Sequence, residues 1–178
     1  TFDDGVYKAT VPSRLALAFD DRAVANVYLK TDADGGKTLA IAFRGTDGFS
    51  TDTVLGWGPQ MKDAYYPLYK PLLDAVRKYA ATNNVDDVLV TGHSLGAAMA
   101  QYAMRDLKDT SETKYKAAIF GSPGAVDSGT RAEDRMIEFE YTDDIFVALE
   151  DTPFVDFEHQ GQRIRMPLPM PRRDRAAA

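Results

Sequence analysis

The chain contains no cysteine, and this absence removes several kinds of chemistry at once. Without a thiol there are no disulfide bonds, no cysteine-ligated zinc and no thiol nucleophile. Histidine is also scarce: the 178 residues include only His93 and His159, so a mechanism that needs an imidazole base has two candidates. No apolar run approaches the ~20 residues that a membrane-spanning helix needs.

An excess of positive charge is missing too. The formal net charge is -6 at pH 7, which argues against nucleic acid as a partner, because phosphate binding needs a basic surface. It also argues against tight electrostatic docking on anionic membranes. A neutral small-molecule substrate, or a lipid met in transient contact with an interface, remains open. The sequence leaves the oligomeric state open.

The remaining composition is that of an ordinary globular protein. Hydrophobic residues make up 44% of the chain and charged residues 27%, and no repeat or linker divides it. We therefore expect a single domain over residues 1–178. The chain begins at Thr1 without a leader-like segment and ends in three alanines, so we expect a processed or excised piece, truncated at its C-terminus.

Short apolar segments rich in β-formers alternate with segments of helical spacing. One helical segment is expected to begin near Pro71, because proline is well tolerated in the first turn of a helix. This alternation predicts an α/β fold with a mainly parallel sheet flanked by helices. The expected strands are residues 24–31, 38–45, 86–92, 116–124, 135–141 and 162–168, and the expected helices are 71–84 and 94–107.

The stretch "DADGG" at 32–36 separates the first two expected strands. Its aspartates resemble the start of a calcium-binding loop, but the twelfth position of such a loop is Phe43 here rather than an acidic residue. We therefore interpret the stretch as a hairpin turn.

The pentapeptide "GHSLG" at 92–96 lies between an apolar strand and a helical segment. This is the context of a nucleophile elbow, in which a sharp turn exposes a serine at the carboxyl end of the sheet. Gly92 and Gly96 leave room for the strand and helix to approach each other. The alternative is that Ser94 only caps the helix. The two glycines and the preceding strand favour Ser94 as a nucleophile.

A serine nucleophile needs hydrogen-bond donors for the oxyanion that forms during acyl transfer. One donor is expected to be the backbone N–H of Leu95, the residue after the serine. The other should come from a loop at the end of an earlier strand, where "AFRGTD" (42–47) stands. Gly45 permits an unusual turn there, and Thr46 offers both its N–H and its hydroxyl.

Four motifs in this order resemble the fungal-type (class 3) lipase family of α/β-hydrolases: "IAFRGTD", "VTGHSLGAAMA", "FGSPGAVD" and "TDDIFVAL". The resemblance covers most of residues 24 to 150. It implies ester hydrolysis by a Ser-Asp-His triad, an oxyanion residue at Thr46, and a lid over residues 48–58. Trp57 in that lid is then a candidate for contact with substrate or lipid, and packing in the core is the equal alternative.

The resemblance also implies a triad acid in the loop after the strand that follows "GSP". Asp144, followed by Ile145, matches the family pattern better than Asp143, which is the runner-up. His93 is not expected to be the base, because its side chain should leave the turn on the side opposite Ser94 and pack in the core.

His159 is the remaining candidate base, and the order Ser94, Asp144, His159 is the one this fold uses. Many members of the family carry a similar His-x-Gly before the last strand and place the catalytic histidine after it. Two readings therefore stay open: His159 is the base, or it is a structural histidine and the base lies beyond the end of the chain.

Together these features predict a serine carboxylic-ester hydrolase that acts on acylglycerols or similar esters and needs no metal or cofactor. A phospholipase A1 or a polyester hydrolase is the alternative within the same class. The alternative from another class is a catalytically inactive lipase-like domain that binds lipid or protein. The resemblance implies a secreted, extracellular protein.

Overall fold

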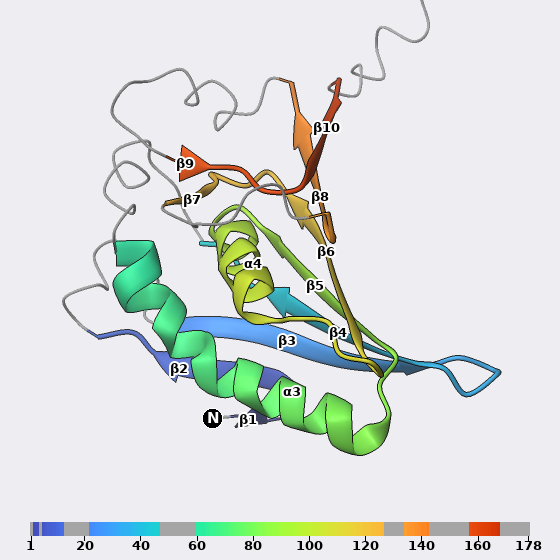
Figure 1. The fold of residues 1–178 in the computed structure, drawn as a ribbon. Coiled ribbons are helices and arrows are strands. Elements are labelled where there is room, and N and C mark those ends of the chain that lie inside the picture. Colours follow the sequence, from blue (N-terminus) through green and yellow to red (C-terminus); the bar gives the residue numbers. More distant parts are fainter. Residues whose placement is uncertain are drawn as a thin grey trace, which may run out of the picture.

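The computed structural model describes residues 2–3, 5–12, 22–46, 60–126, 134–142 and 157–167 (Figure 1). Trp57, Asp143 and Asp144 lie outside these residues, so the predictions made for them stay predictions. Within the described part, eight strands form one sheet in the order β1-β2-β3-β4-β5-β6-β8-β10, and β7 pairs with β9. The strands are β1 (Phe2–Asp3), β2 (Val6–Thr10), β3 (Arg22–Thr31), β4 (Lys37–Phe43), β5 (Asp87–His93), β6 (Lys114–Phe120), β7 (Ala125–Val126), β8 (Met136–Tyr141), β9 (Phe157–Glu158) and β10 (Gln162–Met166).

The mainly parallel sheet is confirmed. Strands β4, β5, β6, β8 and β10 are neighbours in that order and run parallel, while β1, β2 and β3 extend the sheet by antiparallel pairing. Phe43 on β4 pairs with Gly92 on β5, Gly92 with Ile119 on β6, and Ile119 with Glu138 on β8. These strands therefore end at a common carboxyl edge, where the loops of an α/β fold carry the functional groups.

The connection from β4 to β5 contains three consecutive helical segments: a π-helix η1 (Met61–Tyr65), a 3-10 helix η2 (Tyr66–Tyr69) and α3 (Lys70–Asn83). The expected helix is confirmed with a proline in the first turn of α3. It ends at Asn84, whose left-handed φ of 52° allows the chain to turn into β5. The Tyr66 hydroxyl donates a 2.5 Å hydrogen bond to Asp106 and so ties this connection to the next helix.

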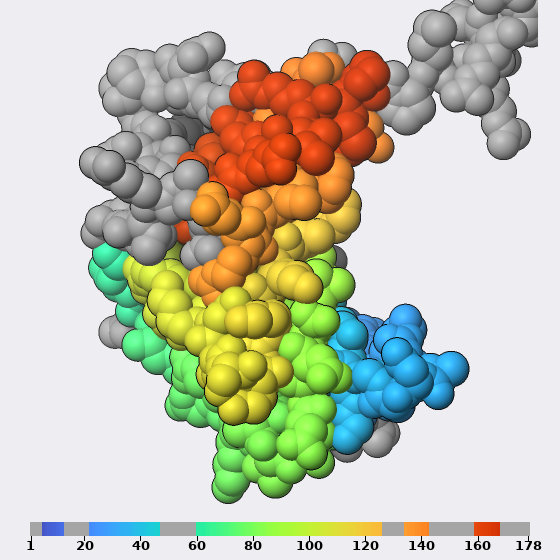
Figure 2. Space-filling view, turned by 45° about the vertical axis from the view of Figure 1, so that its right-hand side comes forward, coloured from blue at the N-terminus to red at the C-terminus, as the bar shows by residue number. Residues whose placement is uncertain are grey.

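Helix α4 (Leu95–Asp106) follows β5 directly, and together with α3 it covers one face of the sheet. In the view of Figure 1 both helices lie in front of the strands. The burial of β5 follows this arrangement: Val88, Val90 and Gly92 are buried towards the helices, and Leu89 and His93 are exposed on the other face. The described core therefore lies between the sheet and the layer formed by α3 and α4. Figure 2 shows β8 and β10 at one end of the molecule.

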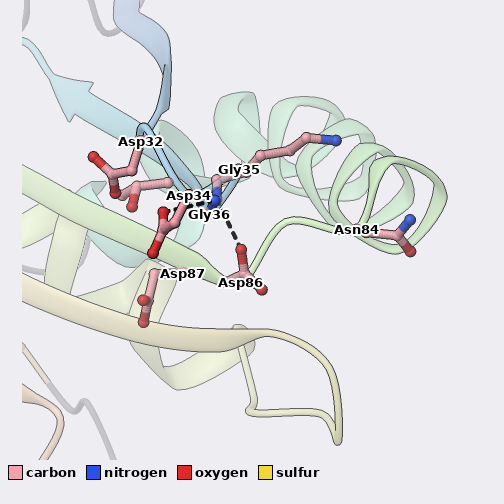
Figure 3. Close-up of a pocket in the computed structure, with 9 residues that line it drawn as sticks. Asp32, Asp34, Gly35, Gly36, Asn84, Asp86 and Asp87 are labelled. Atoms are coloured by element: carbon pink, nitrogen blue, oxygen red, sulfur yellow. Dashed lines mark hydrogen bonds between the residues drawn. The ribbon is translucent and has the colours of Figure 1, made fainter.

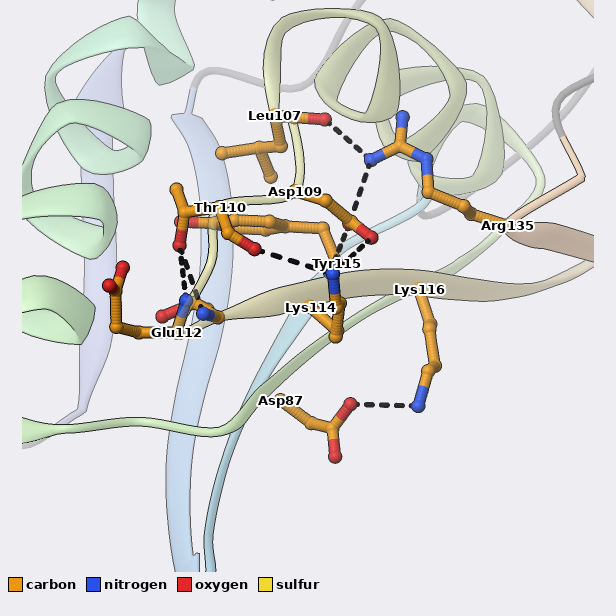
Figure 4. Close-up of polar contacts among 10 residues, drawn as sticks. Asp87, Leu107, Asp109, Thr110, Glu112, Lys114, Tyr115, Lys116 and Arg135 are labelled. Atoms are coloured by element: carbon orange, nitrogen blue, oxygen red, sulfur yellow. Dashed lines mark hydrogen bonds and ion pairs between the residues drawn. The ribbon is translucent and has the colours of Figure 1, made fainter.

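The segment between α4 and β6 is fixed by polar contacts around Asp109 (Figure 4). Its carboxylate accepts a 2.9 Å hydrogen bond from the backbone N–H of Tyr115. This bond, with the nearby Lys114 and Arg135 charges, lowers the pKa of Asp109 against the opposing effect of burial. Arg135 also donates to the carbonyl oxygen of Leu107 at 2.9 Å. These contacts fix the segment that connects α4 to β6, and with it the register at which β6 begins.

The turn at 32–36 forms the expected hairpin between β3 and β4, closed by the Asp32 N–H donating to the Gly36 carbonyl at 2.8 Å. It borders an acidic hollow of about 690 Å³ at the amino ends of β4 and β5 (Figure 3). Asp86 in this hollow accepts a hydrogen bond from the Lys37 N–H at 2.8 Å. The hollow lies at the end of the parallel strands opposite Ser94.

None of the helices in the described part of the chain is both long and apolar enough to cross a bilayer.

Candidate functional site

Ser94 occupies the turn between β5 and α4 in a strained backbone conformation. Its φ is 55° and its ψ is -126°, a region that residues with a side chain rarely adopt. The Ser94 N–H donates a 3.1 Å hydrogen bond to the carbonyl of Phe120 on the neighbouring strand, which holds the turn in place. The strand, the strained serine and the helix are the geometry that the elbow motif predicts.

The glycines on both sides of Ser94 are required by space. A Cβ on Gly92 would lie 2.3 Å from the backbone of Gly96, and a Cβ on Gly96 would lie 2.2 Å from the carbonyl oxygen of Phe43. Neither distance is compatible with a side chain, so the prediction that these glycines allow strand and helix to approach is confirmed.

The end of β4 lies directly against the elbow. A Cβ on Gly45 would lie 2.7 Å from the His93 carbonyl oxygen and 3.6 Å from the Ser94 Cβ. Its φ is not in the left-handed region, so close packing, rather than the unusual turn that the sequence suggested, explains the glycine. This packing places Gly45, the residue before Thr46, directly against the elbow.

Thr46 has a buried hydroxyl group without a hydrogen-bond partner. A buried hydroxyl that makes no hydrogen bond costs about 1–3 kcal/mol, so the fold keeps a donor available here at a cost in stability. Leu95, as the first residue of α4, contributes an N–H that has no acceptor within the helix. The positive end of the helix dipole points towards the same place. These groups suit the stabilisation of a negative oxygen.

His159 is bound to a carboxylate that the sequence reasoning did not identify. Its Nδ1 lies 2.9 and 3.1 Å from the two carboxylate oxygens of Glu138 on β8. The Glu138 side chain is fully buried and that of His159 is 8% exposed. An ionised carboxylate only accepts hydrogen bonds, so Nδ1 carries the proton in this pair and the ring is held in one orientation.

The structure does not join His159 to Ser94. Among the described residues, no hydrogen bond links the Ser94 hydroxyl to the His159 ring. Strand β6 lies between β5 and β8, so the backbone of Glu138 is about two strand spacings, roughly 10 Å, from the strand that ends at Ser94. Ser94, Leu95 and Thr46 thus form one cluster, and His159 with Glu138 forms another.

A signal for Glu138 was present in the sequence. Glu138 and Glu140 alternate with apolar residues in β8, and Arg163 and Arg165 have the same two-residue spacing in β10. Because parallel neighbours in register point to the same face, this spacing predicts a ladder of carboxylates and guanidinium groups. The observed contacts include Arg163 to Glu140 and Arg165 to Glu140, both at 2.7 Å.

The expectation that His93 packs in the core is wrong. His93 is exposed at the end of β5, because it alternates with the buried Gly92 and lies on the sheet face that α3 and α4 do not cover.

Two further buried polar residues escaped the sequence reasoning. Gln101 on α4 and Ser122 in the loop after β6 are both 0% exposed and share a 2.7 Å hydrogen bond. The only signal for this pair is a glutamine in a helix whose other buried residues are nearly all apolar. Within the described ranges, no group of three or more His, Asp or Glu side chains gathers in a way that would hold a metal ion.

Comparison with known proteins identifies one family. The family model described as Mbeg1-like matches residues 19–141. No curated protein gives a significant match to the chain.

Solved structures with a similar fold are fungal lipases. The lipase from Rhizopus microsporus var. chinensis superimposes with a TM-score of 0.58 at 18% identity over 91% of this chain and 62% of that protein. A fungal lipase–inhibitor complex gives a TM-score of 0.55 at 20% identity, over 90% of this chain and 66% of that one. A triacylglycerol lipase from Penicillium expansum gives a TM-score of 0.53 at 15% identity, over 90% of this chain and 68% of that one. The chain therefore has an α/β-hydrolase fold and spans about two thirds or less of each of these enzymes.

Proposed function

Because the chain belongs to the Mbeg1-like family and shares the fold of fungal lipases, we propose that it is a serine carboxylic-ester hydrolase with Ser94 as its nucleophile. The observation that carries this proposal is the strained Ser94 turn with Gly45 packed against it, one residue before Thr46, whose buried hydroxyl has no hydrogen-bond partner. Strain and an unpartnered buried donor both cost stability, and catalysis gives a reason for each.

In the proposed reaction, the Ser94 hydroxyl attacks the carbonyl carbon of an ester and passes its proton to a general base. The negative oxygen that forms is stabilised by the Leu95 N–H and by the N–H and hydroxyl of Thr46. The base then gives the proton to the leaving alcohol, and an acyl-enzyme remains. Water repeats the sequence on the acyl-enzyme and releases the carboxylic acid, so no metal or cofactor takes part.

We propose His159 as the base and Asp144 as the acid that orients it, as the motif order implies. The Glu138 carboxylate at Nδ1 supports a second arrangement, in which Glu138 does what a triad acid does and fixes the tautomer of the ring. The two carboxylates make different predictions. Glu138→Gln disturbs catalysis if Glu138 is the acid, and Asp144→Asn disturbs it if Asp144 is.

The test is hydrolysis of p-nitrophenyl butyrate together with covalent labelling by a fluorophosphonate probe. We expect the wild-type chain to react in both assays and Ser94→Ala to lose both. Activity that survives Ser94→Ala unchanged would overturn the proposal. Labelling that His159→Asn leaves intact would remove His159 from the mechanism but keep Ser94 as the nucleophile.

The proposed substrates are acylglycerols or similar neutral esters, with phospholipid or polyester as alternatives within the class. The negative net charge supports a neutral substrate. A panel of esters that varies the acyl-chain length and the head group separates these substrates. The alternative from another class, an inactive lipase-like domain that binds lipid or protein, is supported by the absence of a hydrogen bond between Ser94 and His159. It predicts no fluorophosphonate labelling of the wild-type chain.

A further inference from the structure

Gln101 is a buried amide in the helix that follows the nucleophile. It lies seven residues after Ser94, two helical turns further on along the same side of α4, and it is 0% exposed. The buried residues around it in this helix are alanine, methionine and tyrosine. Its Oε1 atom has no hydrogen-bond partner, and an unpaired buried amide oxygen lowers the stability of the fold. A leucine would fill the same position without that cost.

The amide nitrogen of Gln101 is bonded to the loop that follows β6. Its Nε2 donates to the Ser122 Oγ at 2.7 Å, and the Gly124 N–H donates to the same oxygen at 3.0 Å. Ser122 is itself 0% exposed. At the start of this loop, the Gly121 N–H donates to the Phe139 carbonyl at 2.9 Å. The loop is therefore fixed both to the sheet and to α4.

The elbow and the loop are joined at two points. The first is the hydrogen bond from the Ser94 N–H, directly before α4, to the carbonyl of Phe120, the last residue of β6 before the loop. The second is the bond from Gln101 to Ser122, two turns along the helix. Packing against the sheet already restrains α4, and a second hydrogen bond two turns from the first adds a restraint on its tilt. Two points fix the direction of the helix, and with it the directions of the Leu95 N–H and the Ser94 hydroxyl.

We propose that Gln101 is a positioning residue of the ester-hydrolase site, which acts through Ser122 to hold the orientation of α4 beneath the nucleophile. The inference rests on the proposed function. Its physical basis is that acyl transfer requires the nucleophile and the oxyanion donors within a fraction of an ångström of their productive positions, and a displacement near 1 Å lowers the rate about 100-fold. The buried glutamine is then retained because it supports activity, although it lowers the stability of the fold.

The test uses Gln101→Leu and Ser122→Ala, singly and together, with p-nitrophenyl butyrate as substrate. We expect each single variant to lower kcat by about tenfold or more with little change in KM, and the double variant to lose no more than the single ones, because both remove the same bridge. Ser122→Thr, which keeps the hydroxyl, should retain activity. Gln101→Leu should unfold at the same temperature as the wild type or a higher one.

Met99→Leu is the matched control, since Met99 is a fully buried residue of α4 that takes no part in the bridge. It should change kcat little. A Gln101→Leu variant with unchanged kcat would overturn the inference, as would losses of activity in the single variants that add in the double variant or that follow a lowered Tm. If Ser94→Ala abolishes activity while Gln101→Leu keeps it, only the positioning role fails. If Ser94→Ala stays active, the proposed function itself fails.

Discussion

The backbone of Ser94 stores strain that can be measured separately from activity. Its φ of 55° with ψ of -126° disfavours any residue that has a Cβ, at a cost of about 1–3 kcal/mol, and glycine adopts such angles freely. Ser94→Ala and Ser94→Gly both remove the hydroxyl, but only the glycine variant removes the strain. We expect both to be inactive and Ser94→Gly to be more stable than Ser94→Ala by about 1 kcal/mol, measured by urea unfolding. Equal stability of the two would contradict the strained elbow.

Ser94 and Thr46 could be proposed from the sequence because their neighbours are constrained locally. Gly92 and Gly96 are needed wherever a strand and a helix meet this closely, and such constraints appear as short motifs. The partner of His159 could not be found in the same way. Glu138 lies 21 residues before it and reaches it only through the pairing of β8 with β10. His93 was misjudged because its burial depends on which face of the sheet the helices cover.

At the scale of elements, β10 is held to β8 by charge. Glu140 is 2% exposed and accepts hydrogen bonds from Arg163 and Arg165 at 2.7 Å each. Burial alone would raise the pKa of Glu140, but the two guanidinium groups outweigh it and lower the pKa below the ordinary value of 4.5. A carboxyl group whose pKa is lower in the folded state than in the unfolded state stabilises the fold at pH values above its unfolded-state pKa. That stability is lost as the pH falls through the folded-state pKa.

The corresponding variant is Glu140→Gln, which keeps the shape and removes the charge. We expect it to lower the free energy of unfolding by about 2 kcal/mol at pH 7, because it removes the charge of a buried carboxylate that accepts hydrogen bonds from two partly exposed guanidinium groups. The difference from wild type should shrink as the pH falls below about 4.5, where the wild-type carboxyl group begins to lose its advantage. Thermal unfolding between pH 3 and pH 7 measures both.

Glu112→Gln is the control for this prediction, since Glu112 is an exposed carboxylate between α4 and β6. It should change the unfolding temperature little. A Glu140→Gln variant whose deficit is the same at pH 3 and pH 7 would show that the lost stability does not come from the charge.

The order of elements was more predictable than their edges. All six expected strands and both expected helices are present, because apolar periodicity reports directly on which residues a strand or helix buries. No sequence signal indicated β1 or β2, which are short: β2 pairs with β3, and β1 pairs only with β2. It also missed β7 and β9, two-residue strands that exist only because they pair with each other.

At the scale of the whole molecule, the strand order explains why α3 and α4, among the described helices, lie on the same face of the sheet. From β4 onwards each parallel strand is added on the same side of the previous one. Since crossover connections are right-handed, two helices that follow successive parallel strands in such a series lie on the same face. Helices α3 and α4 therefore share one face, and apolar side chains on the other remain exposed, among them Leu89, Phe120, Ile137 and Tyr141 at 36%, 43%, 36% and 40%.

The face of the sheet opposite α3 and α4, where these apolar side chains are exposed, should bind an apolar dye in the folded state. Phe120 and Phe139 stack there with ring centroids 5.4 Å apart, and Ile137 lies beside them on the same strand as Phe139. A contiguous exposed apolar surface of this kind is uncommon in soluble proteins. We expect the native chain to enhance the fluorescence of anilinonaphthalene sulfonate and the double variant Phe120→Thr with Ile137→Thr to lose about half of that signal. Threonine suits a strand, so the unfolding temperature should change little.

Tyr28→Thr provides the comparison, since Tyr28 is 60% exposed on the β3–β4 hairpin, several strands away from the aromatic stack. An isolated exposed aromatic contributes little to dye binding, so this variant should keep the signal. If Tyr28→Thr lowered the fluorescence as much as the double variant, the dye would be responding to scattered surface groups. The selective loss in the double variant is what a one-sided sheet requires, because the exposed apolar residues then lie together on a single face.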